Sequence, residues 1–324
     1  MIRVLITGGA GFVGRHFVKH FADCGDEVTL IDNMISGVPP EDWLHKPERT
    51  DRLKIHFTDC RSFLTAMNSG YFDLVVHCAA VIGGRLKIEN DALAVATNLS
   101  IDSEFFNWVV RSKKMPKVIY FSSSAVYPPS WQTEDRHIPL PEHYVDLKNS
   151  RVELPDRTYG FSKLAGEVLA RYAWDEYGLD VHVYRPFGGY GDDQSFDYPF
   201  PSIIRRIVKG EDPVKVWGSG DQRRDFIYID DVVRCVLETL DAPPGTVLNI
   251  GTGVGVSFIE LAHRACKVLG KNLLVRNDPD KPEGVFWRVA DITQMDRYYT
   301  PRITLDDGIE RVAHRIEKAL VNHG

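Results

Sequence analysis

A tyrosine and a lysine four residues apart, Tyr159 and Lys163, are the side chains of this sequence best suited to acid–base chemistry. Residues four apart project from one face of a helix, and the segment that they open has helical period. A phenol with a reference pKa of about 10 is a poor base at neutral pH, but a neighbouring ammonium favours the phenolate. The pair therefore predicts that Tyr159 removes a proton from a substrate hydroxyl. Because this spacing also arises by chance in many helices, other residues must support the interpretation.

Three consecutive serines supply a third candidate group. Ser122, Ser123 and Ser124 come at the end of an apolar run, and Ser123 precedes Tyr159 by 36 residues. If the run is a strand of a parallel sheet, these hydroxyls lie at the carboxyl end of the strand, where such folds bind ligands. A turn-forming serine cluster is the alternative.

A glycine-rich turn near the N-terminus predicts a dinucleotide site. Gly8, Gly11 and Gly14 lie between the first apolar run and the first helical segment, and Asp32 ends the second run 18 residues after Gly14. The glycines permit a tight turn against a pyrophosphate, and the carboxylate can bond both ribose hydroxyls while repelling a 2′-phosphate. We therefore expect NAD rather than NADP. A glycine turn with a solvated aspartate is the alternative. Asp59, after the third run, either meets the adenine or is an ordinary loop residue.

The alternation of apolar runs and helical segments predicts the fold class. Strands buried on both faces and separated by helices are typical of a parallel, doubly wound sheet. We therefore expect an α/β protein with a Rossmann-type doubly wound parallel sheet and a smaller C-terminal α/β substrate lobe. Residues 1–185, with about 216–255, form the expected NAD-binding domain, and 186–215 with 256–324 form the substrate-binding lobe. The expected strands are 4–7, 27–31, 54–57, 74–77, 118–122, 181–184 and 247–250, and the expected helices include 14–24, 92–111, 159–177 and 307–322.

The composition argues against several classes of partner. A net charge of −6 over 324 residues disfavours a broad nucleic-acid or anionic-membrane surface. Five dispersed cysteines and eleven histidines without ligand spacing predict neither a disulfide framework nor a metal. No leader pattern or long apolar run is present. We expect a cytoplasmic protein without nucleic-acid or membrane partners.

The motifs together resemble the extended short-chain dehydrogenase/reductase family, in its NAD-dependent epimerase/dehydratase group. The resemblance covers essentially the whole chain and rests on TGGAGFVG at 7–14, HCAA at 77–80, SSSAVY at 122–127, YGFSK at 159–163, RPFGGYG at 185–191 and WGSGDQRRDFIYIDDV at 217–232. It implies a homodimer built from two helices per subunit, a tightly held NAD that is regenerated in each cycle, and a nucleotide-sugar substrate. It assigns Ser123, Tyr159 and Lys163 to catalysis.

The resemblance also implies the residues that line the two ligand sites. The cofactor-binding residues are Gly8, Gly11, Phe12, Val13, Gly14, Asp32, Asn33, Asp59, Cys60, Ala79, Ala80, Asn98, Ser122, Tyr159, Lys163 and Pro186. The substrate-binding residues are Gly84, Arg85, Ser123, Ser124, Tyr159, Gly188, Arg224 and Arg288. Arg224 and Arg288 are diphosphate candidates, since arginine suits bidentate phosphate contacts, although each is otherwise a surface arginine. Gly188 stands where the family usually has an asparagine that touches the diphosphate.

The reaction is predicted by elimination within that family. Relatives that dehydrate carry Asp and Glu at the positions of Ser124 and Ala125, and relatives that decarboxylate keep the Glu. Relatives that act as 3,5-epimerases need a cysteine at the position of Ala125. The 3,5-epimerases also need a second acid/base group, and Tyr198 or Pro199 stands at about that position in this sequence. We therefore expect 4-epimerisation through a transient 4-keto sugar. A 4-keto-sugar reductase is the first alternative, followed by a 3,5-epimerase or 4,6-dehydratase with displaced groups, and then by a non-catalytic NAD-binding protein.

Three short loops favour a GDP-sugar over a UDP-sugar. Residues 81–85 resemble the Gly-Gly loop of GDP-sugar enzymes in the family, and Tyr127-Pro128 and residues 217–220 do likewise. Each signal is weak alone, and dTDP-sugars also stay open.

Overall fold

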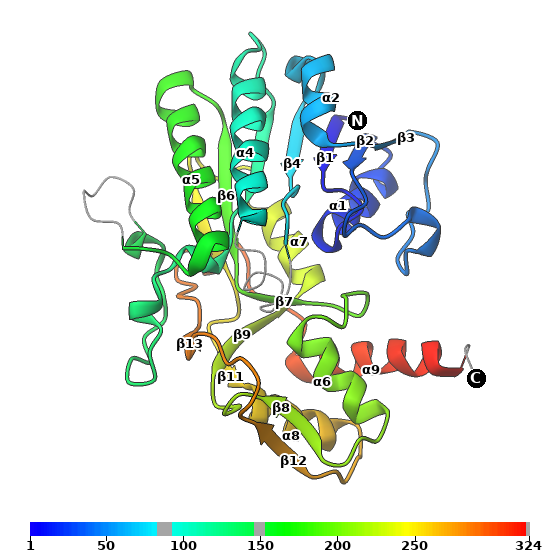
Figure 1. Cartoon of the computed structure of the whole chain (residues 1–324). Helices are drawn as coiled ribbons and strands as arrows, with labels where there is room; N and C mark the ends of the chain where they lie inside the picture. The colour runs from blue at the N-terminus through cyan, green and yellow to red at the C-terminus, as the bar shows by residue number, and fades with distance from the viewer. Residues whose placement is uncertain (83–92, 146–152, 322–324) are drawn as a thin grey trace.

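A parallel sheet forms the larger unit of the computed structural model, which describes residues 1–82, 93–145 and 153–321 (Figure 1). The sheet has seven strands in the order β10-β6-β5-β4-β1-β2-β3. The order changes direction between β1 and β4, as in doubly wound folds, and this confirms the predicted fold class. The strands are β1 (Arg3–Thr7), β2 (Glu27–Asp32), β3 (Leu53–Phe57), β4 (Leu74–His77), β5 (Lys117–Phe121), β6 (Val181–Pro186) and β10 (Val247–Ile250).

Helices cover both faces of this sheet, because the strands are apolar on both sides. Alternate strand residues point to opposite faces, so that Val4 and Ile6 enter one core while Leu5 enters the other. One face carries α2, α4 and α5, and the other carries α1 and α7 (Figure 1). Their bounds are α1 (Phe12–Asp23), α2 (Cys60–Ala66), α4 (Ala94–Val110), α5 (Arg157–Tyr177) and α7 (Ile229–Glu238).

A smaller unit lies beyond the carboxyl edge of the large sheet (Figure 1). In it β9 pairs with β7, β11 and β13, and β8 pairs with β12. The core beneath α1 and α7 continues into this unit through Ile203, Leu261 and Ile309. Although β9 belongs to the smaller sheets, α7 and β10 belong to the larger unit, and the expected boundaries stay a prediction. The elements are β7 (Gly188–Tyr190), α6 (Pro199–Val208), β8 (Val214–Trp217), β9 (Arg223–Tyr228), β11 (Gly255–Ser257), α8 (Phe258–Val268), β12 (Val275–Asp278), β13 (Trp287–Arg288) and α9 (Leu305–Val321).

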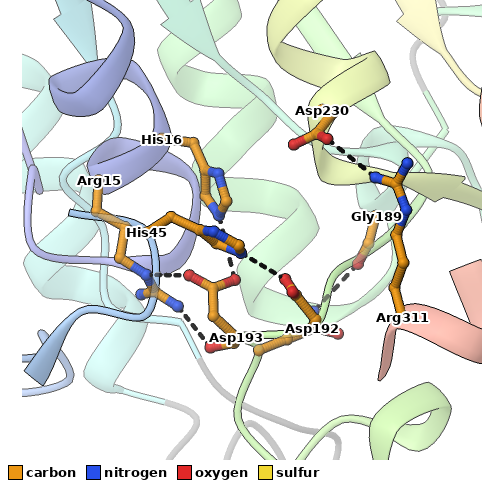
Figure 2. Close-up of polar contacts among 9 residues, drawn as sticks. Arg15, His16, His45, Gly189, Asp192, Asp193, Asp230 and Arg311 are labelled. Atoms are coloured by element: carbon orange, nitrogen blue, oxygen red, sulfur yellow. Dashed lines mark hydrogen bonds and ion pairs between the residues drawn. The ribbon is translucent and has the colours of Figure 1, made fainter. Parts of the chain in front are cut away.

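A cluster of charged side chains joins the two units beside the glycine turn (Figure 2). Arg15 on α1 donates to the Asp193 carboxylate at 2.6 Å, and His16 Nε2 lies 3.1 Å from the same group. His45 Nε2 lies 2.9 Å from Asp192, which raises the pKa of the imidazole. Both aspartates follow β7, so the cluster fixes the start of the segment that leads to α6.

Substituting Asp193→Asn should destabilise the fold by about 3 kcal/mol, because Arg15 would keep a buried charge without its counterion. The side chains of Arg15 and Asp193 are each 6% exposed. Asp306→Asn is the matched control: its pair with Arg264 is nearly half exposed and should contribute at most about 1 kcal/mol. Urea unfolding near neutral pH measures both changes.

The pH dependence of that stability follows from the pKa of Asp193, which is lowered to about 2 although burial opposes the change. The folded-state pKa lies below the unfolded value of about 4, so the contribution is present above about pH 4 and is lost toward pH 2. Two results would contradict this assignment. One is an equal loss in the free energy of unfolding for Asp193→Asn and Asp306→Asn. The other is a difference in that free energy between the wild type and Asp193→Asn that does not shrink in acid.

Candidate active site

The glycine turn after β1 has no room for larger residues. Gly8 has a φ of +68°, and a Cβ there would lie 2.7 Å from the Ala79 amide nitrogen. A Cβ on Gly14 would overlap the Gly8 carbonyl oxygen. The turn therefore brings the N-terminus of α1 close to the end of β4. Unpaired amides at a helix N-terminus suit a pyrophosphate, so this part of the structure fits a dinucleotide.

Asp32 lies at the end of β2, where a ribose would meet the sheet edge. It is 9% exposed, and its carboxylate accepts hydrogen bonds from the Ala10 amide at 3.0 Å and the Met34 amide at 2.8 Å. These two bonds orient the carboxylate beside the glycine turn and leave lone pairs for ribose hydroxyls. The position matches the role expected for Asp32.

Asp59 has a local role that the sequence alone did not reveal. Its side chain caps α2 by accepting from the Arg61 amide at 2.9 Å and forms an ion pair with the Arg61 guanidinium at 2.6 Å. That guanidinium lowers the pKa of Asp59. The predicted contact with adenine stays a prediction, and in this structure the carboxylate is already paired.

The remaining predicted cofactor residues gather along the same edge of the sheet. Phe12 and Val13 open α1, Cys60 opens α2 with a buried thiol whose pKa burial raises to about 12, and Asn33 is exposed after β2. The edge is completed by Ala79 and Ala80 after β4, Ser122 after β5 and Pro186 at the end of β6.

The catalytic candidates meet where β5 ends and α5 begins. Ser123 caps the short helix η3 (Ser124–Val126), and its hydroxyl is hydrogen-bonded to Tyr159. A Cβ on Gly160 would overlap the Ala125 carbonyl, so this glycine lets α5 start against η3. Lys163 is 3% exposed and donates to the Phe121 carbonyl at 2.8 Å. The structure therefore brings the serine, the phenol and the ammonium together as expected.

The protonation of this group follows from its burial. Burial raises the pKa of Tyr159 to about 12, and the hydrogen bond with Ser123 acts in the opposite direction. Burial lowers the pKa of Lys163. The phenol therefore needs additional positive charge nearby before it can ionise close to neutral pH.

Buried polar contacts fix α5 against the sheet and α4 against the segment that follows β4. Glu167 accepts from the Ser122 hydroxyl at 2.5 Å and forms a two-pronged ion pair with Arg185 of β6 at 2.9 and 2.6 Å. Asn98 of α4 bonds both polar backbone atoms of Val81, at 2.6 and 3.1 Å. Asn98 therefore anchors the segment after β4, which agrees with a structural contribution to the site.

The predicted substrate residues are only partly brought to the site. Ser124 is buried in η3, and Gly188 lies in β7, where a Cβ would approach the Asp225 carbonyl oxygen to 2.5 Å. Arg224 on β9 has its guanidinium 5.5 Å from the Phe258 ring centroid. Gly84 and Arg85 lie outside the described residues. The diphosphate role of Arg224 stays a prediction.

Arg288 is engaged within the protein. It forms an ion pair at 2.6 Å with Asp156, the N-cap residue of α5, and donates to Gln132 at 2.7 Å. These contacts connect β13 to the start of the catalytic helix. Its predicted diphosphate contact is not tested by them, but the position next to α5 gives Arg288 a structural role that the sequence did not indicate.

Tyr198 is a second phenol close to the catalytic one. It is the N-cap residue of α6, and burial, with the Tyr159 and Asp197 side chains nearby, raises its pKa to about 12. The expected position of a second acid/base group is therefore occupied by a phenol that stays protonated at neutral pH.

In the part of the chain that the structure describes, no three His, Cys, Asp or Glu residues are placed to hold a metal ion. Among the helices of the same ranges, none combines the length and apolar character needed to cross a bilayer.

The chain belongs to the NAD dependent epimerase/dehydratase family, whose model matches residues 4–251. The family resemblance expected from the motifs is thereby confirmed. NAD is the cofactor of this family, and the glycine turn and Asp32 have the form that it requires.

Similar proteins span the full chain. A dTDP-4-dehydro-6-deoxy-D-allose reductase from Streptomyces bikiniensis is 30% identical, over 96% of this chain and 94% of its own. A UDP-glucuronate 4-epimerase from Thermodesulfobacterium geofontis is 27% identical, over 96% and 94%. A solved structure of a UDP-glucuronic acid 4-epimerase variant from Bacillus cereus, with UDP-4-deoxy-4-fluoro-glucuronic acid and NAD, is 25% identical, with a TM-score of 0.83, and covers 98% of this chain and 100% of its own.

The variant Asp32→Asn should bind NAD about tenfold more weakly, because a charge-assisted bond to the ribose becomes a neutral one. It should bind NADP more tightly than the wild type does, since the repulsion of a 2′-phosphate is removed. Asp59→Asn is the control on the same edge and should change NAD affinity by less than about threefold, because the carboxylate of the wild type is already paired with Arg61. Calorimetric titration with both dinucleotides measures these effects, and an Asp32→Asn variant with unchanged preference would refute the assignment.

Proposed function

We propose that this protein is an NAD-dependent 4-epimerase of a nucleoside-diphosphate sugar. The observation that carries the proposal is the pair Ser124 and Ala125, 5% and 6% exposed, directly after the catalytic serine. Neither side chain can exchange a proton with a carbon acid. Within the described part of the site, the phenol–ammonium couple and Ser123 remain, and these suffice to move a hydroxyl proton.

The residues of the chain divide this work between them. Ser123 holds the C4 oxygen of the sugar by a hydrogen bond, and Tyr159 takes the hydroxyl proton and later returns it. Lys163 supplies the positive charge that favours the phenolate. Bound NAD supplies the acceptor and donor for the hydrogen on C4. Between the two half-reactions the 4-keto sugar rotates in the site, so that the hydrogen is returned to the opposite face of C4.

Tyr198 does not replace the missing groups in this scheme. Its pKa is about 12, like that of Tyr159, but in the proposed scheme only Tyr159 has the ammonium of Lys163 to favour its phenolate. Tyr198 is suited instead to hydrogen bonding with a sugar hydroxyl. This supports a reaction confined to C4.

The identity of the nucleotide base in the substrate is a separate question from the reaction. Tyr127, one of the signals for a GDP-sugar, is fully buried and donates to Asn249 at 2.7 Å, so it serves the core. The loop at 83–85 lies outside the described residues. The compared relatives carry names with UDP- and dTDP-sugars, and the preference for a GDP-sugar stays a prediction.

A 4-keto-sugar reductase is the second candidate, favoured by the names of two relatives at 30% identity. Such an enzyme would use the same serine, tyrosine and lysine but would consume external reduced cofactor. The carboxylate of Asp32 weighs against NADPH as that cofactor.

The predicted homodimer also stays a proposal. Phe161 and Tyr172 on α5 are 50% and 60% exposed, as expected of a helix that packs against a second subunit.

Purified protein, incubated without added cofactor with GDP-, UDP- and dTDP-hexoses, should interconvert at least one pair of C4 epimers. An epimerase regenerates its cofactor in each cycle, whereas a reductase needs stoichiometric NADH or NADPH. Chromatography of the nucleotide sugars measures the outcome. Turnover of 4-keto sugars alone, and only with added reduced cofactor, would establish the reductase instead.

Tyr159→Phe should lower kcat by about 10²- to 10⁴-fold, because the acid–base group is lost. Tyr198→Phe, which removes the neighbouring hydroxyl, should retain kcat within about fivefold, since one hydrogen bond to a ground-state hydroxyl is worth about 1 kcal/mol. Circular dichroism and NAD content establish that both variants are folded. A Tyr198→Phe variant as inactive as Tyr159→Phe would assign Tyr198 to the chemistry and reopen 3,5-epimerisation.

A further inference from the structure

A buried chain of polar side chains lies beneath the catalytic helix, and the proposed reaction does not use it. The Thr7 hydroxyl lies 2.7 Å from His77 Nδ1, and His77 Nε2 lies 3.2 Å from the Asp102 carboxylate. The Tyr120 hydroxyl donates to the other oxygen of Asp102 at 2.6 Å. All four residues are at most 1% exposed. This series of hydrogen bonds runs from the glycine turn through β4 and α4 to β5.

The hydrogen-bond pattern fixes the charge of each member. Burial lowers the pKa of His77, so the ring is neutral, with Nδ1 accepting from Thr7 and Nε2 donating to Asp102. Burial also raises the pKa of Tyr120, which stays a donor. Although burial opposes it, the bond from His77 and the nearby charge of Lys163 lower the pKa of Asp102. The carboxylate is therefore ionised and held by two neutral donors.

The packing of α4 against α5 is shaped around this carboxylate. A Cβ on Gly166 of α5 would overlap the Tyr120 hydroxyl and approach the Asp102 carboxylate to 2.6 Å. The glycine leaves the space that the Tyr120–Asp102 pair occupies. One turn earlier on α5, the Lys163 ammonium lies 5.1 Å from the centroid of the Tyr120 ring. Tyr120 thus touches the ammonium with its ring and the carboxylate with its hydroxyl.

The Lys163 ammonium needs a counterion, because an uncompensated charge is costly in an apolar interior. The groups that face it are Asp102 from α4, Glu167 and Tyr159 from α5, Tyr120 from β5, and His77 and Cys78 from β4 and its end.

These groups differ in the charge that they can offer. Glu167 is neutralised by the two-pronged pair with Arg185. Burial raises the pKa of the Cys78 thiol to about 12, so it is neutral. Both phenols and His77 are neutral as well. Of the groups named, Asp102 alone carries a negative charge that no arginine neutralises, and this charge raises the pKa of Lys163.

We propose that Asp102 is a positioning residue for catalysis: its buried carboxylate is the counterion that keeps the Lys163 ammonium charged beneath Tyr159. The inference rests on the proposed roles of Tyr159 and Lys163 and extends them to a residue outside the tyrosine–lysine motif. His77 and Tyr120 orient the carboxylate, and Gly166 makes room for it. The charge state of the catalytic lysine is thereby set from the opposite helix.

The test is the titration of Lys163 in the full-length, NAD-loaded protein. Lysine labelled with carbon-13 at Cε reports the pKa of each ammonium by nuclear magnetic resonance, and the signal missing from Lys163→Met identifies Lys163. In Asp102→Asn the midpoint for Lys163 should fall by about one pH unit or more, because the charge that favours the ammonium is gone. In Tyr120→Phe, which keeps the charge and the ring, it should move by less than about 0.3 units. A wild-type midpoint in Asp102→Asn, or an equal shift in Tyr120→Phe, would overturn the proposal.

A reciprocal variant keeps the proposal testable if Asp102→Asn folds poorly. Lys163→Met leaves the carboxylate without its cation, so Asp102 should take up a proton at mildly acidic pH. Infrared spectroscopy should then show the stretch of a buried protonated carboxyl that is absent from the wild type and from the double variant Lys163→Met/Asp102→Asn. Absence of that band from Lys163→Met would contradict the proposal. Neither readout requires turnover, so failure of the proposed function and failure of this inference give different results.

Discussion

The site depends on keeping a positive charge in a place that water does not reach. Lys163 is almost fully buried, and its ammonium must remain charged if the neighbouring phenol is to give up a proton near neutral pH. Burial acts against both requirements, since it lowers the pKa of the lysine and raises that of the tyrosine. The carbonyl of Phe121, the ring of Tyr120 and the carboxylate of Asp102 offset that cost from three sides.

The fold explains how one short stretch of helix reaches all of these groups. Parallel strands end at a common edge, so the glycine turn, Asp32 and the serines meet there from β1, β2 and β5. Gly160 and Gly166 allow α5 to approach η3 and the Tyr120–Asp102 pair. The ion pair of Glu167 with Arg185 then fixes the helix against β6. The catalytic geometry is therefore a consequence of how closely α5 can pack.

Much of this arrangement could be predicted from local patterns. The apolar runs at 4–7 and 74–77 indicated strands buried on both faces, and the structure places alternate residues in two separate cores. The glycine spacing and the tyrosine–lysine spacing predicted the two ends of the candidate site, because both patterns reflect short-range backbone geometry.

The partners of charged side chains could not be predicted in the same way. Arg288 pairs with Asp156 across 132 residues, and Arg15 pairs with Asp193 across 178 residues. Asp102 is not among the site residues predicted from the sequence, because its influence on Lys163 arises only from the packing of α4 on α5. Such pairings depend on tertiary distances that composition and periodicity do not contain.

The central claim is that the chemistry is confined to C4 of the sugar, and the fate of a hydrogen isotope at that carbon tests it most directly. A nucleotide sugar deuterated at C4 should be converted to its epimer with the deuterium still on C4, in light water and without added cofactor. Mass spectrometry and nuclear magnetic resonance of the product locate the label. Loss of deuterium from C4 to solvent, or entry of solvent hydrogen at C3 or C5 when the experiment is run with the isotopes reversed, would contradict the account.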